Sequence, residues 1–148
     1  MVDLGCWPGG WLQVAAQAVG DRGRVVGVDR RPLHPPLELP NVWALEGDLG
    51  DPAVLEQVRG LLGGSADVLL SDAAPRLSGV RAADRAHSEE LLGAVERAIP
   101  LLLGAGGSLL VKLLDCPQAA AFQKRLRSRF RSARSVRPEA TRKGSSER

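Results

Sequence analysis

Long apolar stretches and cysteines are the two things this chain has little of. The 148 residues contain no charged leader with an apolar run behind it and no stretch of roughly 18 or more apolar residues, so the sequence indicates neither secretion nor a membrane span. The two cysteines, Cys6 and Cys116, are too few for a disulfide framework and lack the spacing of a zinc site. We therefore expect an intracellular protein in a reducing compartment, without a metal.

Charge is distributed unevenly along the chain. Residues 1–123 carry 10 basic and 15 acidic side chains, whereas residues 124–148 carry 10 basic and 2 acidic ones. A basic segment of that density is typical of a surface that binds a polyanion, most commonly nucleic acid. A solvated helix face followed by a frayed terminus explains the same composition, and composition alone does not decide between the two.

Strand and helix signals alternate and predict an α/β fold, with a mostly parallel sheet and helices on both faces. Residues 104–107 should form a turn, residues 32–40 a proline-rich loop, and Pro100 should kink or end a helix. The first expected strand ends at Leu4, and the others span 24–29, 41–45, 67–71 and 108–114. The expected helices span residues 10–19, 52–62 and 83–103. A last expected helix turns Phe122, Leu126 and Phe130 inward.

A glycine-rich segment, DLGCWPGGW (residues 3–11), joins the first strand to the first helix. Glycines let a backbone approach a ligand closely, although glycines that merely make a tight turn give the same pattern. Asp29 ends the second strand, where a carboxylate can accept both hydroxyls of an adenosine ribose. Asp48 follows the third strand, where it can accept from an adenine amino group or simply cap a helix or turn. Together these signals favour a cofactor that contains adenosine.

The spacing of the glycines bears on which cofactor this is. A dinucleotide site needs G-x-G-x-x-G to seat a pyrophosphate at the helix N-terminus. Here the glycines run G-x-x-x-G-G, and Pro8 removes a backbone donor. The pattern therefore disfavours a nicotinamide cofactor and favours S-adenosylmethionine.

Asp72 follows the fourth strand within SDAAP (residues 71–75), so it should lie at the carboxyl edge of the sheet, where open α/β folds bind ligands. Methyltransferases that modify amino groups place an aromatic residue beside this position, and those that modify the cytosine ring place a cysteine there. Neither residue type is present near Asp72. A ribose hydroxyl remains as the natural target.

Lys112 interrupts a strand that is otherwise apolar, and lysine is rarely buried without a function. Burial favours the neutral form of a lysine, which can accept a proton, and an acid such as Asp72 would orient it. Lys112 is therefore a candidate base for a hydroxyl proton. The alternative is a lysine at a strand end with its ammonium in water.

Taken together, DLGCWPGGW, GVD, EGD, SDAAP, SLLVKLL and RPEATRKGSSE resemble, in that order and spacing, the FtsJ/RrmJ family of ribosomal RNA 2′-O-methyltransferases over essentially the whole chain. The resemblance implies a Rossmann-like class I fold in one domain over residues 1–148, with S-adenosylmethionine as cofactor. It implies methylation of the ribose of a uridine in large-subunit ribosomal RNA. The expected protein is a monomer that binds ribosomal RNA and the large ribosomal subunit, and no membrane, in the cytoplasm or alternatively in the mitochondrion.

The family uses a Lys-Asp-Lys-Glu tetrad, whose last three members correspond by motif to Asp72, Lys112 and Glu147. The first lysine would lie upstream of Met1 and a last strand is also missing, so we expect this chain to be a fragment. Cys6 and Trp7 replace small residues of the family. The predicted cofactor-binding residues are Gly5, Gly9, Trp11, Asp29, Asp48 and Asp72.

Two other functions stay open at this point. A catalytically inactive, methyltransferase-like module that binds RNA or assists ribosome assembly would keep the fold while lacking the upstream lysine and the last strand. An NAD-dependent oxidoreductase would use the same kind of sheet, and the glycine spacing disfavours it.

Overall fold

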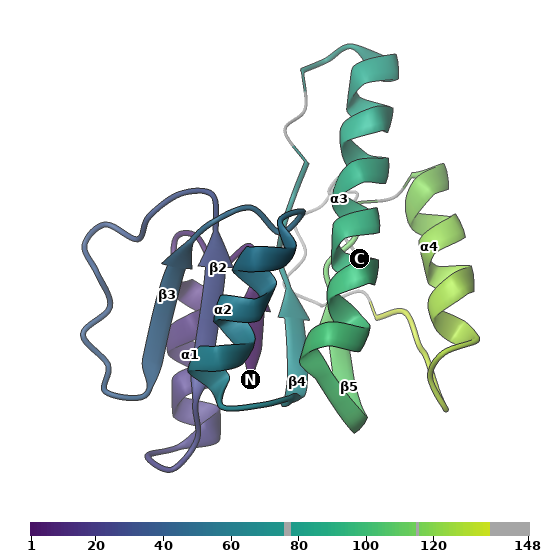
Figure 1. Ribbon diagram of the computed structural model, residues 1–148. Coiled ribbons are helices and arrows are strands. Elements are labelled where there is room, and N and C mark those ends of the chain that lie inside the picture. Colours follow the sequence, from purple (N-terminus) through teal and green to yellow (C-terminus); the bar gives the residue numbers. More distant parts are fainter. Residues whose placement is uncertain (76–77, 115, 137–148) are drawn as a thin grey trace. The chain divides into compact units, whose positions relative to one another are not determined.

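Five parallel strands form the sheet of the protein in a computed structural model that describes residues 1–75, 78–114 and 116–136 (Figure 1). Their order across the sheet is β3-β2-β1-β4-β5, and each neighbouring pair is parallel. Residues 2–4 and 25–28, in two of the central strands, are buried on both faces of the sheet, as is typical of a parallel sheet. The strands are β1 (Val2–Leu4), β2 (Val25–Asp29), β3 (Val42–Glu46), β4 (Ala66–Ser71) and β5 (Leu103–Val111).

The described residues form four helices, α1 (Gly10–Val19), α2 (Pro52–Leu62), α3 (Arg81–Leu102) and α4 (Pro117–Arg127). A helix follows every strand except β2, which a loop connects to β3. Figure 1 shows α1 behind the sheet and α2 in front of it. The Asp51 side chain caps α2 by accepting from the backbone N–H of Ala53 at 2.9 Å, and Pro52 follows in the first turn. The predicted fold class is confirmed. Among the described residues, no helix has both the length and the apolar character needed to cross a bilayer.

The chain packs as two compact units. The first comprises Met1–Ala73 and Gly93–Val111, and it holds the sheet, α1, α2 and the second half of α3. The second comprises Ala74–Leu92 and Lys112–Arg148, and it holds the first half of α3 and α4. The expectation of one domain over residues 1–148 stays a prediction.

The core of the first unit lies between α1 and the sheet. Three α1 side chains, Leu12, Ala15 and Ala16, are buried against Cys6, Val25 and Leu70. Each large apolar side chain buried in this way contributes about 1.5–3 kcal/mol. Leu33 and Leu37, in the loop between β2 and β3, pack against the same cluster. This loop takes the place of a helix between these two strands.

The two halves of α3 differ in burial. Its buried side chains, all from Ala94 onward, belong to the first unit. Pro100 lies inside the helix, which continues to Leu102. In its first turn, the Asp84 carboxylate accepts from Ser78 and Gly79, which precede the helix. These bonds lower the pKa of Asp84, first through the Ser78 backbone N–H. In the second unit, Gln118 of α4 donates to Glu89 of α3 at 3.4 Å.

The predictions for the last strand and the last helix are partly wrong. Residues 104–107, expected to form a turn, lie inside β5 as an irregularity between the pairs Ala66–Leu103 and Val68–Ser108. The strand ends at Val111 instead of Leu114 because its partner β4 ends at Ser71, directly opposite Val111. Helix α4 ends at Arg127, so Phe130 lies beyond it. Phe122 is fully buried, while Leu126 and Phe130 are half-buried.

Candidate active site

The order of the strands reverses between β1 and β4. From β1 the chain runs outward through β2 to β3, then crosses to β4 on the other side of β1 and continues to β5. At such a reversal the loops on the two sides diverge, and open α/β sheets bind ligands in the space beyond the carboxyl ends of the strands. The glycine-rich segment follows β1, and Asp72 follows β4. The fold therefore brings both to the edge where the sequence placed them.

Gly5 is the point at which the two loops approach most closely. Its φ of +83° lies in the left-handed region, and a Cβ built on it would lie 2.5 Å from the Cα of Ala73. Its N–H donates to the Val28 carbonyl at 2.8 Å, which continues the ladder beyond β1. Only glycine fits here, and the close approach is to the backbone of the neighbouring loop.

Gly9 is the N-cap residue of α1 and also has a positive φ, of 102°. A Cβ on Gly9 would meet Leu37 at 3.2 Å and Leu33 at 3.6 Å, so this glycine packs beneath the β2–β3 loop. Trp11, in the first turn of α1, is half-buried against the core cluster. Roles of Gly9 and Trp11 in cofactor binding stay predictions.

Three carboxylates share one face of the sheet at this edge. Asp3 of β1 pairs with Gly27 and Leu70, and side chains alternate between faces along a strand. Asp29 lies two residues after Gly27, and Asp72 lies two residues after Leu70. Both side chains are therefore on the same face as Asp3. The Asp72 N–H donates to the Leu4 carbonyl at 3.1 Å and so continues the ladder. Gly5, between Asp29 and Asp72, has no side chain to separate them.

Asp3 is the residue that the sequence predictions missed. It is fully buried, and neither of its carboxylate oxygens has a hydrogen-bond partner among the described residues. Burial raises the pKa of Asp3 to about 7, and the charges of Asp72 and Asp29 add to the shift. An acid inside the apolar strand Val2–Leu4 was a visible signal, of the same kind that singled out Lys112.

Asp29 lies at the end of β2 and accepts two backbone hydrogen bonds. Its Oδ2 accepts from the N–H of Trp7 at 3.1 Å, and its Oδ1 accepts from the N–H of Arg31 at 2.9 Å. Each carboxylate oxygen has further lone pairs, so Asp29 can still accept the two hydroxyls of a ribose. These bonds fix the carboxylate at the carboxyl edge of the sheet.

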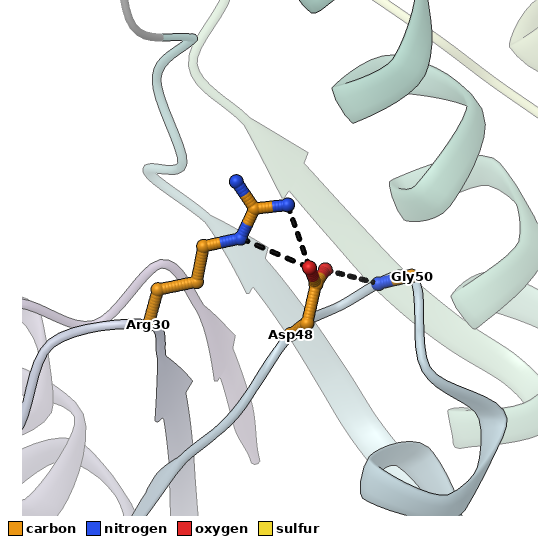
Figure 2. A network of polar contacts seen from close by, with 3 residues as sticks. All are labelled: Arg30, Asp48 and Gly50. Atoms are coloured by element: carbon orange, nitrogen blue, oxygen red, sulfur yellow. Dashed lines mark hydrogen bonds and ion pairs between the residues drawn. The ribbon is translucent and has the colours of Figure 1, made fainter.

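Asp48 is held by a network that Figure 2 shows from close by. Its Oδ2 accepts from Arg30 Nη2 at 2.7 Å and from Arg30 Nε at 3.1 Å, while its Oδ1 accepts from the Gly50 N–H at 2.7 Å. The Gly50 N–H and then Arg30 hold the pKa of Asp48 below its usual value. The bond to Gly50 is the turn contact that the sequence left open as an alternative. A contact of Asp48 with adenine stays a prediction, and Arg30 is a partner that the sequence did not reveal.

The predicted catalytic residues are not all within the first unit. Lys112 directly follows the last residue of β5 and is half-buried, so the expectation that it interrupts a strand is wrong. It belongs to the second unit, whereas Asp72 belongs to the first. Glu147 lies outside the described residues.

Comparison with known proteins decides the family. The model for the FtsJ-like methyltransferases matches residues 1–148. This chain belongs to that family. Among curated relatives, two proteins named ribosomal RNA large subunit methyltransferase E match 99% of this FtsJ-like chain. The one from Methanothrix thermoacetophila is 42% identical, and the one from Methanobrevibacter smithii is 38% identical. The chain spans 56% and 70% of their lengths, respectively.

A solved structure supports the fold of this FtsJ-like chain. The crystal structure of a Plasmodium falciparum protein, described as a ribosomal RNA methyltransferase, superposes with a TM-score of 0.80 at 24% identity. The match covers 94% of this chain and 79% of the other. Family and fold together confirm the predicted Rossmann-like methyltransferase class and its cofactor, S-adenosylmethionine. They argue against the NAD-dependent alternative.

The residues of the first unit fit this cofactor. S-adenosylmethionine carries positive charge on its sulfur and on its amino group, and Asp3 is a buried carboxylate without a partner in the described residues. Two more carboxylates, Asp29 and Asp72, face the same side of the sheet. Charges of one sign that repel one another are stabilised by a ligand of the opposite sign. The edge of this FtsJ-like sheet is therefore suited to a cationic adenosyl compound.

Proposed function

We propose that this chain is the core of an enzyme that methylates large-subunit ribosomal RNA. The enzyme transfers a methyl group from S-adenosylmethionine to the ribose 2′-hydroxyl of a uridine. The observation that carries the proposal is the family match over residues 1–148 together with the three carboxylates at one edge of the sheet. The names of the curated relatives support the choice of ribosomal RNA. A monomer bound to the large subunit, in the cytoplasm or the mitochondrion, belongs to the same proposal.

Cofactor binding would use the carboxyl edge of the first unit. Asp29 would accept the ribose hydroxyls, and Asp48 would accept from the adenine amino group. Asp72, Gly5, Gly9 and Trp11 would surround the methionine part. When bound, S-adenosylmethionine supplies a methyl group on a positively charged sulfur. The backbone N–H groups of Trp7 and Arg31 both donate to Asp29 and hold its acceptor oxygens in place.

The reacting hydroxyl would be held by Asp72, Lys112 and Glu147. By motif, these three residues correspond to the last three members of the tetrad of the family. Lys112 would accept the hydroxyl proton or hold the oxygen in line for transfer, and Asp72 and Glu147 would orient the lysine. Positioned proton transfer of this kind is worth on the order of a hundred- to ten-thousand-fold in rate.

The direct test is transfer of labelled methyl groups to large ribosomal subunits whose RNA lacks the modification. We expect transfer by the full-length wild-type protein and a loss of on the order of a hundred-fold or more with Lys112→Ala. Cofactor affinity, measured by calorimetry, should not change in this variant. Undiminished transfer by Lys112→Ala would remove this lysine from the mechanism. Cofactor and RNA binding without transfer by the wild type would instead favour the inactive RNA-binding module.

A further inference from the structure

An exposed tryptophan stands at the cofactor-binding edge. The Trp7 side chain lies in the loop after β1 and is 45% exposed, although aromatic residues make up only 3% of the chain. The family that the sequence resembles has a small residue at this position. A large apolar side chain exposed beside a ligand-binding edge is a signal of an interaction surface. The roles assigned to the cofactor residues leave this indole unexplained.

Arg31 covers the indole of Trp7. Its guanidinium carbon lies 4.8 Å from the ring centroid, a cation–π contact. The two residues meet because the Asp29 carboxylate accepts from both of their backbone N–H groups, at 3.1 Å and 2.9 Å. One carboxylate at the end of β2 thus positions an aromatic ring and a guanidinium together, next to where the ribose of the cofactor would bind.

The charge of this pair is available to a partner. Arg31 is exposed and makes no ion pair with any residue in the described ranges, whereas its neighbour Arg30 is paired with Asp48. A planar aromatic ring beside an uncompensated guanidinium is the combination that proteins use for single-stranded nucleic acid. The ring stacks on a base, and the cation neutralises a phosphate.

We propose that Trp7 and Arg31 form a contact surface for single-stranded RNA at the rim of the cofactor-binding edge. This surface would hold a nucleotide of the substrate near the methyl donor, so it rests on the proposed function for the choice of RNA. Trp7 contributes base stacking and Arg31 contributes a phosphate contact. Neither residue touches the reacting atoms, so both are positioning residues.

The same unit contains a matched control pair. Arg24 lies over the Trp43 ring at 5.9 Å, which makes the same kind of contact. Arg24 stands before β2, whereas Asp29 is at the end of that strand. The control pair is therefore removed from the carboxyl edge and should not contact RNA that is held there.

The test measures affinity for a fluorescently labelled, uridine-rich single-stranded RNA by anisotropy, over a range of salt concentrations. We expect Trp7→Ala to bind about tenfold more weakly, with an unchanged salt dependence, because a stacking contact is lost. We expect Trp7→Phe to retain most of the affinity. Arg31→Ala should bind more weakly and lower the slope of log affinity against log salt by about 0.7, as for one lost phosphate contact. Arg24→Ala should match the wild type in affinity and slope.

Calorimetry with S-adenosylmethionine on the same variants separates this surface from the cofactor site. Unchanged cofactor affinity with weakened RNA binding supports the proposal. RNA affinity at the wild-type level in both Trp7→Ala and Arg31→Ala overturns it, and so does a loss of cofactor affinity that equals the loss of RNA affinity. If the wild type transfers no methyl group while Trp7→Ala still weakens RNA binding, the surface stands and the proposed enzymatic function fails.

Discussion

Gly5 and Ala73 bring the two loops of the candidate site into backbone contact, since a Cβ on Gly5 would lie 2.5 Å from the Ala73 Cα. We predict that Gly5→Ala lowers the free energy of unfolding by about 2 kcal/mol or more, because the methyl group clashes with backbone and the φ of +83° is unfavourable for alanine. Urea denaturation would measure the change.

Gly60 provides the control for that substitution. It lies inside α2, and a Cβ there would meet nothing within 4 Å. Gly60→Ala should therefore raise the free energy of unfolding, by roughly 0.5–1 kcal/mol, through helix propensity. Equal effects of the two substitutions would contradict the close approach of the loops.

Asp3 should make stability depend on pH. Its ordinary pKa is 3.8 and its pKa in the folded protein is about 7, so between these values the folded protein holds a proton that the unfolded chain has released. This contribution is fully present below about pH 4 and is lost as the pH rises to about 7, at roughly 1.4 kcal/mol for each pKa unit. We predict that the free energy of unfolding falls less steeply with pH across this window in Asp3→Asn.

The comparison needs unfolding curves of both chains at several pH values. The slope with pH is the informative quantity, since the asparagine amide has buried donors of its own. Asp21→Asn removes an exposed carboxylate from the same unit and should keep the wild-type slope. An unchanged slope in Asp3→Asn would show that Asp3 does not take up the proton.

The two thiols should differ in reactivity. Burial, followed by the charges of Asp3 and Asp29, raises the pKa of Cys6 to about 12, so it stays protonated and inert, while Cys116 is only half-buried. We predict that native protein at about pH 8 exposes one thiol to a disulfide reagent and that urea exposes the second, because the thiolate is the reactive form. Cys116→Ser should leave no reactive thiol in the native protein. Rapid native labelling of Cys6 would show that this loop opens.

Asp48 and Arg30 should have opposite effects on cofactor binding. If Asp48 accepts from adenine, Asp48→Ala weakens S-adenosylmethionine binding by about tenfold, the loss of one hydrogen bond to a charged group. Arg30→Ala removes a competing donor and should bind the cofactor at least as tightly. The pair is about half exposed, so neither change should alter stability by more than about 1 kcal/mol. Weaker binding in Arg30→Ala would mean that the arginine itself contacts the cofactor.

Much of the fold could be predicted because its signals are local. Asp51 with Pro52 marks the start of α2, and β-branched runs mark the strands. The end of β5 could not be predicted, because Leu113 and Leu114 are as apolar as the residues before them. Only the length of the partner strand shows that the ladder stops at Val111.

The sequence predicted which single residues lie at this edge of the sheet, but it did not predict which residues contact one another there. Asp29 ends a strand, and Asp48 and Asp72 each follow one, which places all three at one edge. The contacts of Arg30 with Asp48 and of Arg31 with Trp7 join segments that are distant in sequence, and only the pairing of the strands brings them together. Lys112 stays a catalytic candidate on motif grounds.

The loop from Arg30 to Asn41 has a further consequence for how this edge can change over evolution and on binding. Four prolines in it lack a backbone donor, so it cannot readily extend the neighbouring strand or lengthen into a helix. Leu33 and Leu37 pack it onto the core as two apolar anchors. The three residues between these anchors, His34, Pro35 and Pro36, belong to no strand or helix, so the cover over Gly9 can change in length and charge while the strands stay as they are.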